Sequence, residues 1–110
     1  LNERLKNFYR TPIYSNMYYA THRLFVSNNN PLRLHVVKVE QGRVHSFFPF
    51  DGERHSMLWV DTLLLSDNDT LNGFSATMND IIDIAAPSSN ARYLYEIVQC
   101  DKLFMLKKLH

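Results

Sequence analysis

Apolar and polar residues are patterned most regularly around Gln41-Gly42, where valine-rich segments lie on both sides of a turn signal. A two-residue turn there would pair Glu40 with Arg43, Val39 with Val44, Lys38 with His45, Val37 with Ser46 and Val36 with Phe47. Opposite charges and facing valines stabilise neighbouring strands, and a glycine supplies the positive φ of a primed turn. The pattern therefore predicts a β-hairpin.

Three further segments have the composition of strands. Met17–Ser27 is rich in aromatic and β-branched residues and is followed by a polar turn that ends at Pro31. Met57–Leu65 is almost continuously apolar, which is typical of a buried strand. Near the C-terminus, Tyr93–Val98 and Leu103–Leu106 predict a closing hairpin, with a helix over the last eight residues as the alternative.

Two segments change to the helical period. In Ser75–Ala86 the apolar residues follow helical spacing, Thr77 with Asp80 forms a possible capping box, and Pro87 ends the pattern. Leu1–Tyr9 has a similar but shorter apolar face. We therefore expect an α+β fold: a mainly antiparallel sheet of five or six short strands built from hairpins, with one or two short helices at about residues 1–9 and 75–86.

Composition indicates one domain over residues 1–110, with 45% hydrophobic and 21% charged residues. The single cysteine, Cys100, excludes an internal disulfide and fits a reducing compartment. A net charge of +1 does not provide the dense positive field of non-specific nucleic-acid binding. The longest apolar runs are too short to span a bilayer and the N-terminus has no signal-peptide pattern, so we predict a cytoplasmic protein.

Most catalytic and cofactor motifs are missing from the sequence. The five histidines have no metal-binding spacing, and the predicted hairpin places His35 and His45 on opposite faces, so we expect no metal site. The loop Asp67–Gly73 does not match a calcium-binding loop, and three isolated glycines cannot form a phosphate-binding motif. We expect no cofactor.

The segment Ser46–Asp61 contains the one catalytic pair worth testing. Glu53 and His55 would lie on the same side of an extended strand, and a small hydrolase or isomerase could use them as an acid–base pair. Four surrounding aromatic residues would desolvate that pair: Phe47, Phe48, Phe50 and Trp59. The alternative, which we favour, is a solvated polar turn whose flanking aromatic residues belong to the core.

The same segment carries a family resemblance. Within Leu32–Ser66 a hairpin turn leads into Pro-Phe, an acidic residue and a Ser-x-x-Trp motif, here Gly42-Arg43-Val44, Pro49-Phe50, Glu53 and Ser56-x-x-Trp59. This order resembles a group of small uncharacterised proteins from Bacteroides-type bacteria, which implies a cytoplasmic bacterial protein and no catalytic residue. The strand pair HVVKVEQGRV is also similar to the small β-domain beside the barrel of amidohydrolases. The sequence has neither that barrel nor its metal motif, so no hydrolase activity follows.

The first functional hypothesis is a non-enzymatic binding or protein-interaction domain that acts with itself or another protein. Short strands leave edges available for pairing, and Phe50 and Trp59 are the binding residues that we expect. Besides the hydrolase or isomerase, the other alternative to this hypothesis is RNA or DNA binding by the N-terminal third. That third is rich in tyrosine and basic residues: Arg4, Lys6, Tyr9, Arg10, Tyr14, Tyr18, Tyr19 and Arg23. The near-neutral charge makes that partner the less favoured one.

Overall fold

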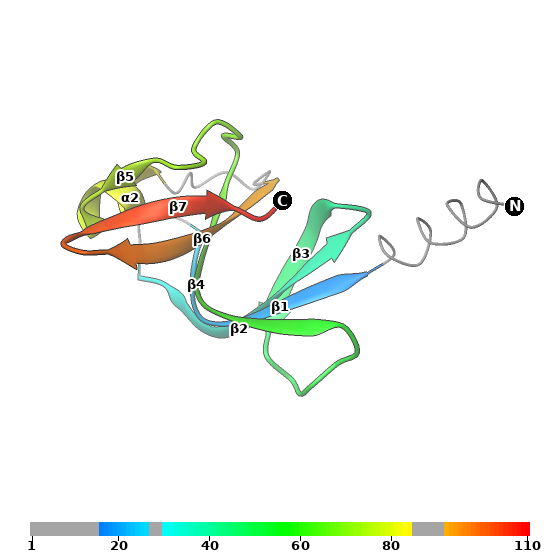
Figure 1. Ribbon diagram of the computed structural model, residues 1–110. Helices are drawn as coiled ribbons and strands as arrows, with labels where there is room; N and C mark the ends of the chain where they lie inside the picture. Colours follow the sequence, from blue (N-terminus) through cyan, green and yellow to red (C-terminus); the bar gives the residue numbers. More distant parts are fainter. Residues whose placement is uncertain (1–15, 27–29, 85–91) are drawn as a thin grey trace, which may run out of the picture.

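A computed structural model describes residues 16–26, 30–84 and 92–110 (Figure 1). Seven strands form one mixed sheet in the order β3-β2-β1-β4-β6-β7-β5, accompanied by one short helix. The elements are β1 (Met17–Phe25), β2 (Leu32–Glu40), β3 (Arg43–Pro49), β4 (Met57–Ser66), β5 (Ser75–Ala76), α2 (Met78–Ile84), β6 (Tyr93–Cys100) and β7 (Leu103–Lys108).

The predicted hairpin at Gln41-Gly42 is confirmed next to its turn and is wrong farther away. Glu40 pairs with Arg43 and Val39 with Val44, and both turn residues have positive φ, 52° and 77°. A β-bulge between Lys38 and Val39 then shifts the register, so that the pairs are Lys38 with Ser46, Val37 with Phe47 and Val36 with Phe48. The bulge leaves one extra residue on β3, which moves every later pair by one position.

The expected fold, mostly sheet with a short helix, is confirmed, but the sheet has seven strands instead of five or six. It is mixed because β1 and β4 are parallel, whereas the other neighbouring strands are antiparallel. The chain passes from β3 to β4 through the seven-residue loop Phe50–Ser56, which contains no helix. This crossing covers three strand spacings, about 14 Å. It also runs back about 10 Å along the sheet, because Pro49 is level with Thr21 through His35 whereas Met57 is level with Tyr18. Seven extended residues reach about 24 Å, which covers both components. A short loop is therefore sufficient for a parallel connection that usually contains a helix.

The helix predicted over 75–86 is confirmed only in its middle. Ser75 and Ala76 pair with β7 instead, as the edge strand β5, and α2 begins at Met78. Thr77 caps the helix as expected, since its Oγ1 accepts a hydrogen bond from the N–H of Asp80 at 3.3 Å. The end of that segment and the helix expected over 1–9 lie outside the described residues.

The closing hairpin is confirmed as β6 and β7, and the alternative of a C-terminal helix is wrong. The strands pair from Tyr95 opposite Lys108 to Cys100 opposite Leu103. Their two-residue turn begins at Asp101, whose φ of 59° is tolerated by aspartate better than by most residues.

Two apolar clusters hold the sheet together. The first lies between β5, β6, β7 and α2 and the end of β4, with buried members Phe25, Leu64, Leu71, Ile81, Tyr95, Ile97 and Leu106. The second joins the β1–β2–β3 part to the rest through Tyr19, Leu24, Val37, Val39, Leu63, Leu65 and Leu94. Figure 1 shows these two parts of the sheet, with β1, β2 and β3 on one side and β5, β6, β7 and α2 on the other.

Candidate functional site

The loop Phe50–Ser56 is tied to the sheet at both of its ends. The N–H of Phe50 donates to the carbonyl of Leu34 at 2.8 Å, and the N–H of Tyr18 donates to the carbonyl of Ser56 at 3.2 Å. Leu34 and Ser56 have positive φ, 51° and 60°, a conformation that residues other than glycine rarely adopt. The carbonyl groups that hold the two ends of the loop therefore belong to residues with unusual backbone conformations.

Arg54 fixes the middle of the loop against the sheet. Its guanidinium lies 5.2 Å from the centre of the Tyr18 ring and 5.0 Å from that of Phe48. The same group donates to both carboxylate oxygens of Asp51, at 3.1 and 2.9 Å. Cations stack favourably on aromatic faces, so Arg54 joins the loop to β1 and β3 at once.

Trp59 is held in place but remains open to solvent. Its Nε1–H donates to Oε1 of Glu53 at 3.2 Å, and its ring lies 5.2 Å from Phe50 and 5.4 Å from His22. The side chain is still 45% exposed. We call the group that surrounds it the aromatic surface: Tyr18, His22, Phe48, Phe50, Arg54 and Trp59.

The expectation that the four aromatic residues of this segment belong to the core is wrong: none of them is a core residue, and Phe48 and Phe50 are only partly buried. Phe47 is 43% exposed and Trp59 is 45% exposed. In the register Trp59 lies beside Ala20, and so on the sheet face opposite to that of Tyr19. The core of this part is built on the Tyr19 face, which leaves Trp59 on the outside.

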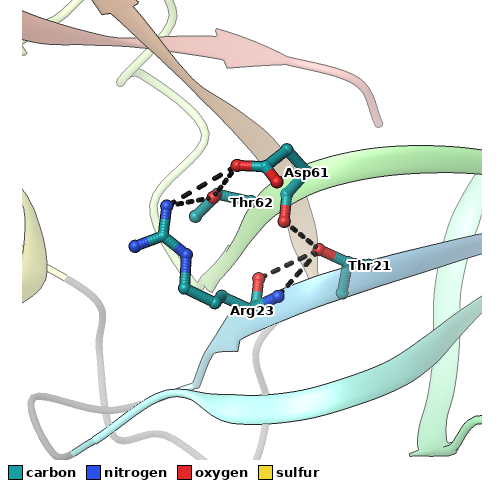
Figure 2. A network of polar contacts seen from close by, with 4 residues as sticks. All are labelled: Thr21, Arg23, Asp61 and Thr62. Atoms are coloured by element: carbon teal, nitrogen blue, oxygen red, sulfur yellow. Dashed lines mark hydrogen bonds and ion pairs between the residues drawn. The ribbon is translucent and has the colours of Figure 1, made fainter.

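A polar network joins β1 to β4 next to the aromatic surface (Figure 2). Thr21 Oγ1 donates to the carbonyl of Asp61 at 2.9 Å, and Arg23 donates to Thr62 Oγ1 at 2.9 Å. Arg23 also pairs with the carboxylate of Asp61 at 3.6 Å. Thr21 and Thr62 are buried whereas the Asp61 side chain is 77% exposed, so the network connects the interior to an acidic group at the surface.

The first half of β4 has an open edge. β4 pairs with β1 from Met57 onward but pairs with β6 only from Leu63 to Ser66. Within residues 16–26, 30–84 and 92–110, no strand pairs with the outer edge of Met57–Asp61. Leu58 and Trp59 point to opposite faces at this edge and are 51% and 45% exposed.

The sequence predicts Phe50 and Trp59 as binding residues, and the structure brings their rings together. The sequence does not predict the exposure of Leu58 or the open edge, because Met57–Leu65 has the apolar pattern of a strand that is buried along its whole length. The charged residue within that run, Asp61, is the only sequence signal that its first half is exposed.

Glu53 and His55 are both exposed, and neither a hydrogen bond nor an ion pair joins them. The carboxylate of Glu53 instead accepts from the Trp59 indole. Their role as an acid–base pair stays a prediction. Among the described residues, no three histidine, cysteine, aspartate or glutamate side chains form a group that could hold a metal ion.

The basic and aromatic N-terminal third is described only from Asn16 onward. In that part Tyr19 is 6% exposed and Arg23 is paired with Asp61 and Thr62. Tyr18 lies under Arg54. Nucleic-acid binding by this third stays a prediction, and the other five of its residues lie outside the described ranges.

Comparisons with models of protein families, with curated proteins and with solved structures found no match to this chain. The resemblance of Leu32–Ser66 to the Bacteroides-type proteins therefore stays a prediction. In the part of the chain that the structure describes, no helix is both long and apolar enough to cross a bilayer.

Proposed function

We propose that this chain is a non-enzymatic protein-interaction domain that binds an extended segment of another protein as an added strand. The observation that carries this proposal is the open edge Met57–Asp61, with Leu58 and Trp59 half exposed on its two faces. Extended peptides add to open sheet edges through main-chain hydrogen bonds, while alternate side chains provide specificity.

Trp59 has the properties of an interaction anchor. Tryptophan is enriched among the residues that dominate binding energy, and a side chain that is already fixed loses little freedom when a partner binds. Glu53, Phe50 and His22 fix the indole here. Trp59 therefore offers an apolar contact area at a low entropic cost.

The charge around this edge supports one class of partner. Asp61 is two positions from Trp59 on the same face, and its side chain is 77% exposed although Arg23 lies 3.6 Å from it. Glu53 forms no ion pair with the described residues. A strand added beside β4 would place alternate side chains along that face. The favoured segment carries two adjacent apolar residues, for Leu58 and Trp59, and a lysine or arginine two positions from the residue that lies opposite Trp59, for Asp61.

A displayed library of linear peptides, selected against the folded chain, tests this proposal. We expect enrichment of two adjacent apolar residues separated by one position from a basic residue, and slower hydrogen exchange at the amides of Met57–Asp61 when a selected peptide is bound. Trp59→Ala and Leu58→Ala should each weaken binding about tenfold, which corresponds to about 1.4 kcal/mol. Leu103→Ala is the matched control, because Leu103 is 42% exposed on β7, outside this edge.

Two outcomes would overturn the proposal. One is a set of selected peptides that bind the Trp59 and Leu58 variants as tightly as the parent chain. The other is a dimer in sedimentation that dissociates in the Trp59 variant, since the edge would then be occupied by a second copy of this chain.

A further inference from the structure

A second surface of the molecule has a different chemistry from the aromatic surface. A cavity of about 640 Å³ opens between the β2–β3 turn, the start of β6 and the residues at and after the end of β7. We call it the basic cleft, and its lining residues are Gly42, Arg43, Val44, Arg92, Tyr93, Lys108 and His110. It contains three permanently cationic side chains and no acidic one.

The cations of the cleft have no acidic partner in the described part of the chain. Arg43, Arg92 and Lys108 take part in none of the ion pairs that the described residues form. Glu40 pairs across the hairpin turn with Arg43 in the register, yet its carboxylate lies near Lys38 and His45, at 3.5 and 3.8 Å. Three cationic side chains thus line the cavity, and no acidic side chain of the described residues forms an ion pair with them.

The walls of the cleft are held by contacts across the molecule. The N–H of Leu94 donates to the carbonyl of His110 at 3.0 Å, and the His110 ring is hydrogen-bonded to the hydroxyl of Tyr19 at 2.7 Å. The ring also lies beside the backbone of Gly42. Lys108 lies 5.0 Å from the centre of the Tyr93 ring. Strands β1 and β6 and the β2–β3 turn are therefore joined behind the cleft.

We propose that the basic cleft binds a small molecule that carries a phosphate group. Two arginines offer paired N–H donors that match phosphate oxygens, and lysine adds a point charge. The volume lies within the range of small-molecule sites. Tyr93 supplies an aromatic wall, and a second cavity of about 550 Å³ shares Arg43 and Val44 with the cleft. That neighbouring space accommodates the part of the ligand beyond its phosphate.

The pKa of His110 reports whether the basic cleft is occupied. Burial lowers the pKa of its imidazole, although the backbone of Gly42 acts in the opposite direction. The charged and titratable groups around it are Tyr19 on β1, Arg43 beside the turn, Arg92 and Tyr93 at β6, and Lys108 on β7. A bound anion favours the protonated imidazole, so occupancy of the cleft should raise the pKa of His110.

Titration with inorganic pyrophosphate at low ionic strength, followed by calorimetry and by NMR, tests the proposal. We expect saturable one-to-one binding, amide shifts at Arg43, Arg92 and Lys108, and a higher pKa for His110 in the complex. Arg43→Gln and Arg92→Gln should each weaken binding about tenfold or more, as expected for hydrogen bonds to charged groups. Arg33→Gln is the matched control, because it removes the same charge from an exposed position of β2 outside the cleft.

Circular dichroism of each variant verifies that it is folded before its affinity is compared. Absence of binding at millimolar pyrophosphate would overturn the proposal, as would equal weakening by Arg33→Gln. Equally tight binding of citrate would overturn the assignment to phosphate. A single-stranded oligonucleotide that binds with a steep salt dependence and spreads its shifts beyond the cleft would replace the small molecule by a nucleic acid.

Discussion

The aromatic surface and the basic cleft differ in how far along the chain their residues come from. Phe48, Phe50, Arg54 and Trp59 lie close together in sequence, and one loop folds them onto β1. The cleft takes its residues from three separated segments, 42–44, 92–93 and 108–110. The first surface therefore needs only one continuous segment and β1, with Tyr18 and His22, whereas the second exists only when the two parts of the sheet are docked. A change at the junction between the two parts of the sheet should disturb the cleft and spare the aromatic surface.

The largest effect that we expect comes from Leu94→Ala. Leu94 is fully buried in the cluster that joins the two parts, and its backbone is bonded to His110 behind the cleft. Removal of a buried leucine side chain lowers the free energy of unfolding by about 2–5 kcal/mol. Urea unfolding followed by circular dichroism measures the loss. Leu58→Ala, the same change at a half-exposed position, should cost about 1 kcal/mol or less.

Pyrophosphate affinity should separate the same two variants, since Leu94→Ala should weaken binding and Leu58→Ala should leave it unchanged. Equal losses of stability from the two variants would contradict the division of the molecule into a docked junction and an open edge.

A smaller effect should follow from Tyr19→Phe. This change removes the hydroxyl that is bonded to His110 and should lower the free energy of unfolding by about 1 kcal/mol. The imidazole resonances of His110 should shift, while the fluorescence maximum of Trp59 stays where it is. Tyr93→Phe is the control, because the hydroxyl of Tyr93 forms no hydrogen bond with the described residues. A shift of Trp59 emission in Tyr19→Phe would mean that the two surfaces are coupled.

Arg54→Ala should affect the aromatic surface and leave the basic cleft unchanged, which is the opposite of Tyr19→Phe. It removes an exposed ion pair with Asp51 and the stacking on Tyr18 and Phe48, which together contribute about 1 kcal/mol or less. Trp59 emission should change because the loop that carries Glu53 is loosened, and pyrophosphate affinity should not. Arg54→Lys keeps the charge but not the planar guanidinium, so a full rescue by lysine would show that the stacking of this group on Tyr18 and Phe48 is unimportant.

The smallest effect concerns pH. The pKa of His110 is lowered in the folded chain from its ordinary value of 6.5, mainly by burial. The unfolded chain therefore binds this proton more readily, so the stability is fully present above about pH 6.5 and is lost as pH falls. Urea midpoints measured from pH 8 to pH 5.5 should decrease, and the decrease should be shallower in His110→Gln. Parallel curves for the two proteins would contradict this role of His110.

The hairpin at Gln41-Gly42 was predictable because its turn chemistry is local. The bulge beside Lys38 was not, since nothing near it in sequence marks an extra residue. Parallel pairing of β1 with β4 was missed for a related reason. In sequence, a seven-residue loop resembles a hairpin connection. Whether the strand after it pairs with β3 or with β1 depends on the tertiary placement of β1 and β2.

For the candidate sites the same distinction holds. Phe50 and Trp59 stand out within one short segment, so their proximity could be predicted, but the exposure of Trp59 depends on which face the distant strands cover. Arg43, Arg92 and Lys108 share no motif and no spacing. Their convergence follows from tertiary docking alone, which single-sequence patterns do not contain.

The parallel pairing of β1 with β4 also has a consequence for synthesis of the chain on the ribosome. Tyr18 pairs with Met57, which is synthesised 39 residues later, so that edge of β1 has no neighbouring strand until then. At general elongation rates of about 5–20 residues per second, this takes about 2–8 s. During that interval β1, β2 and β3 can assemble as a meander with β1 as an unprotected edge. Nascent-chain aggregation should therefore be most sensitive to charges introduced on β1.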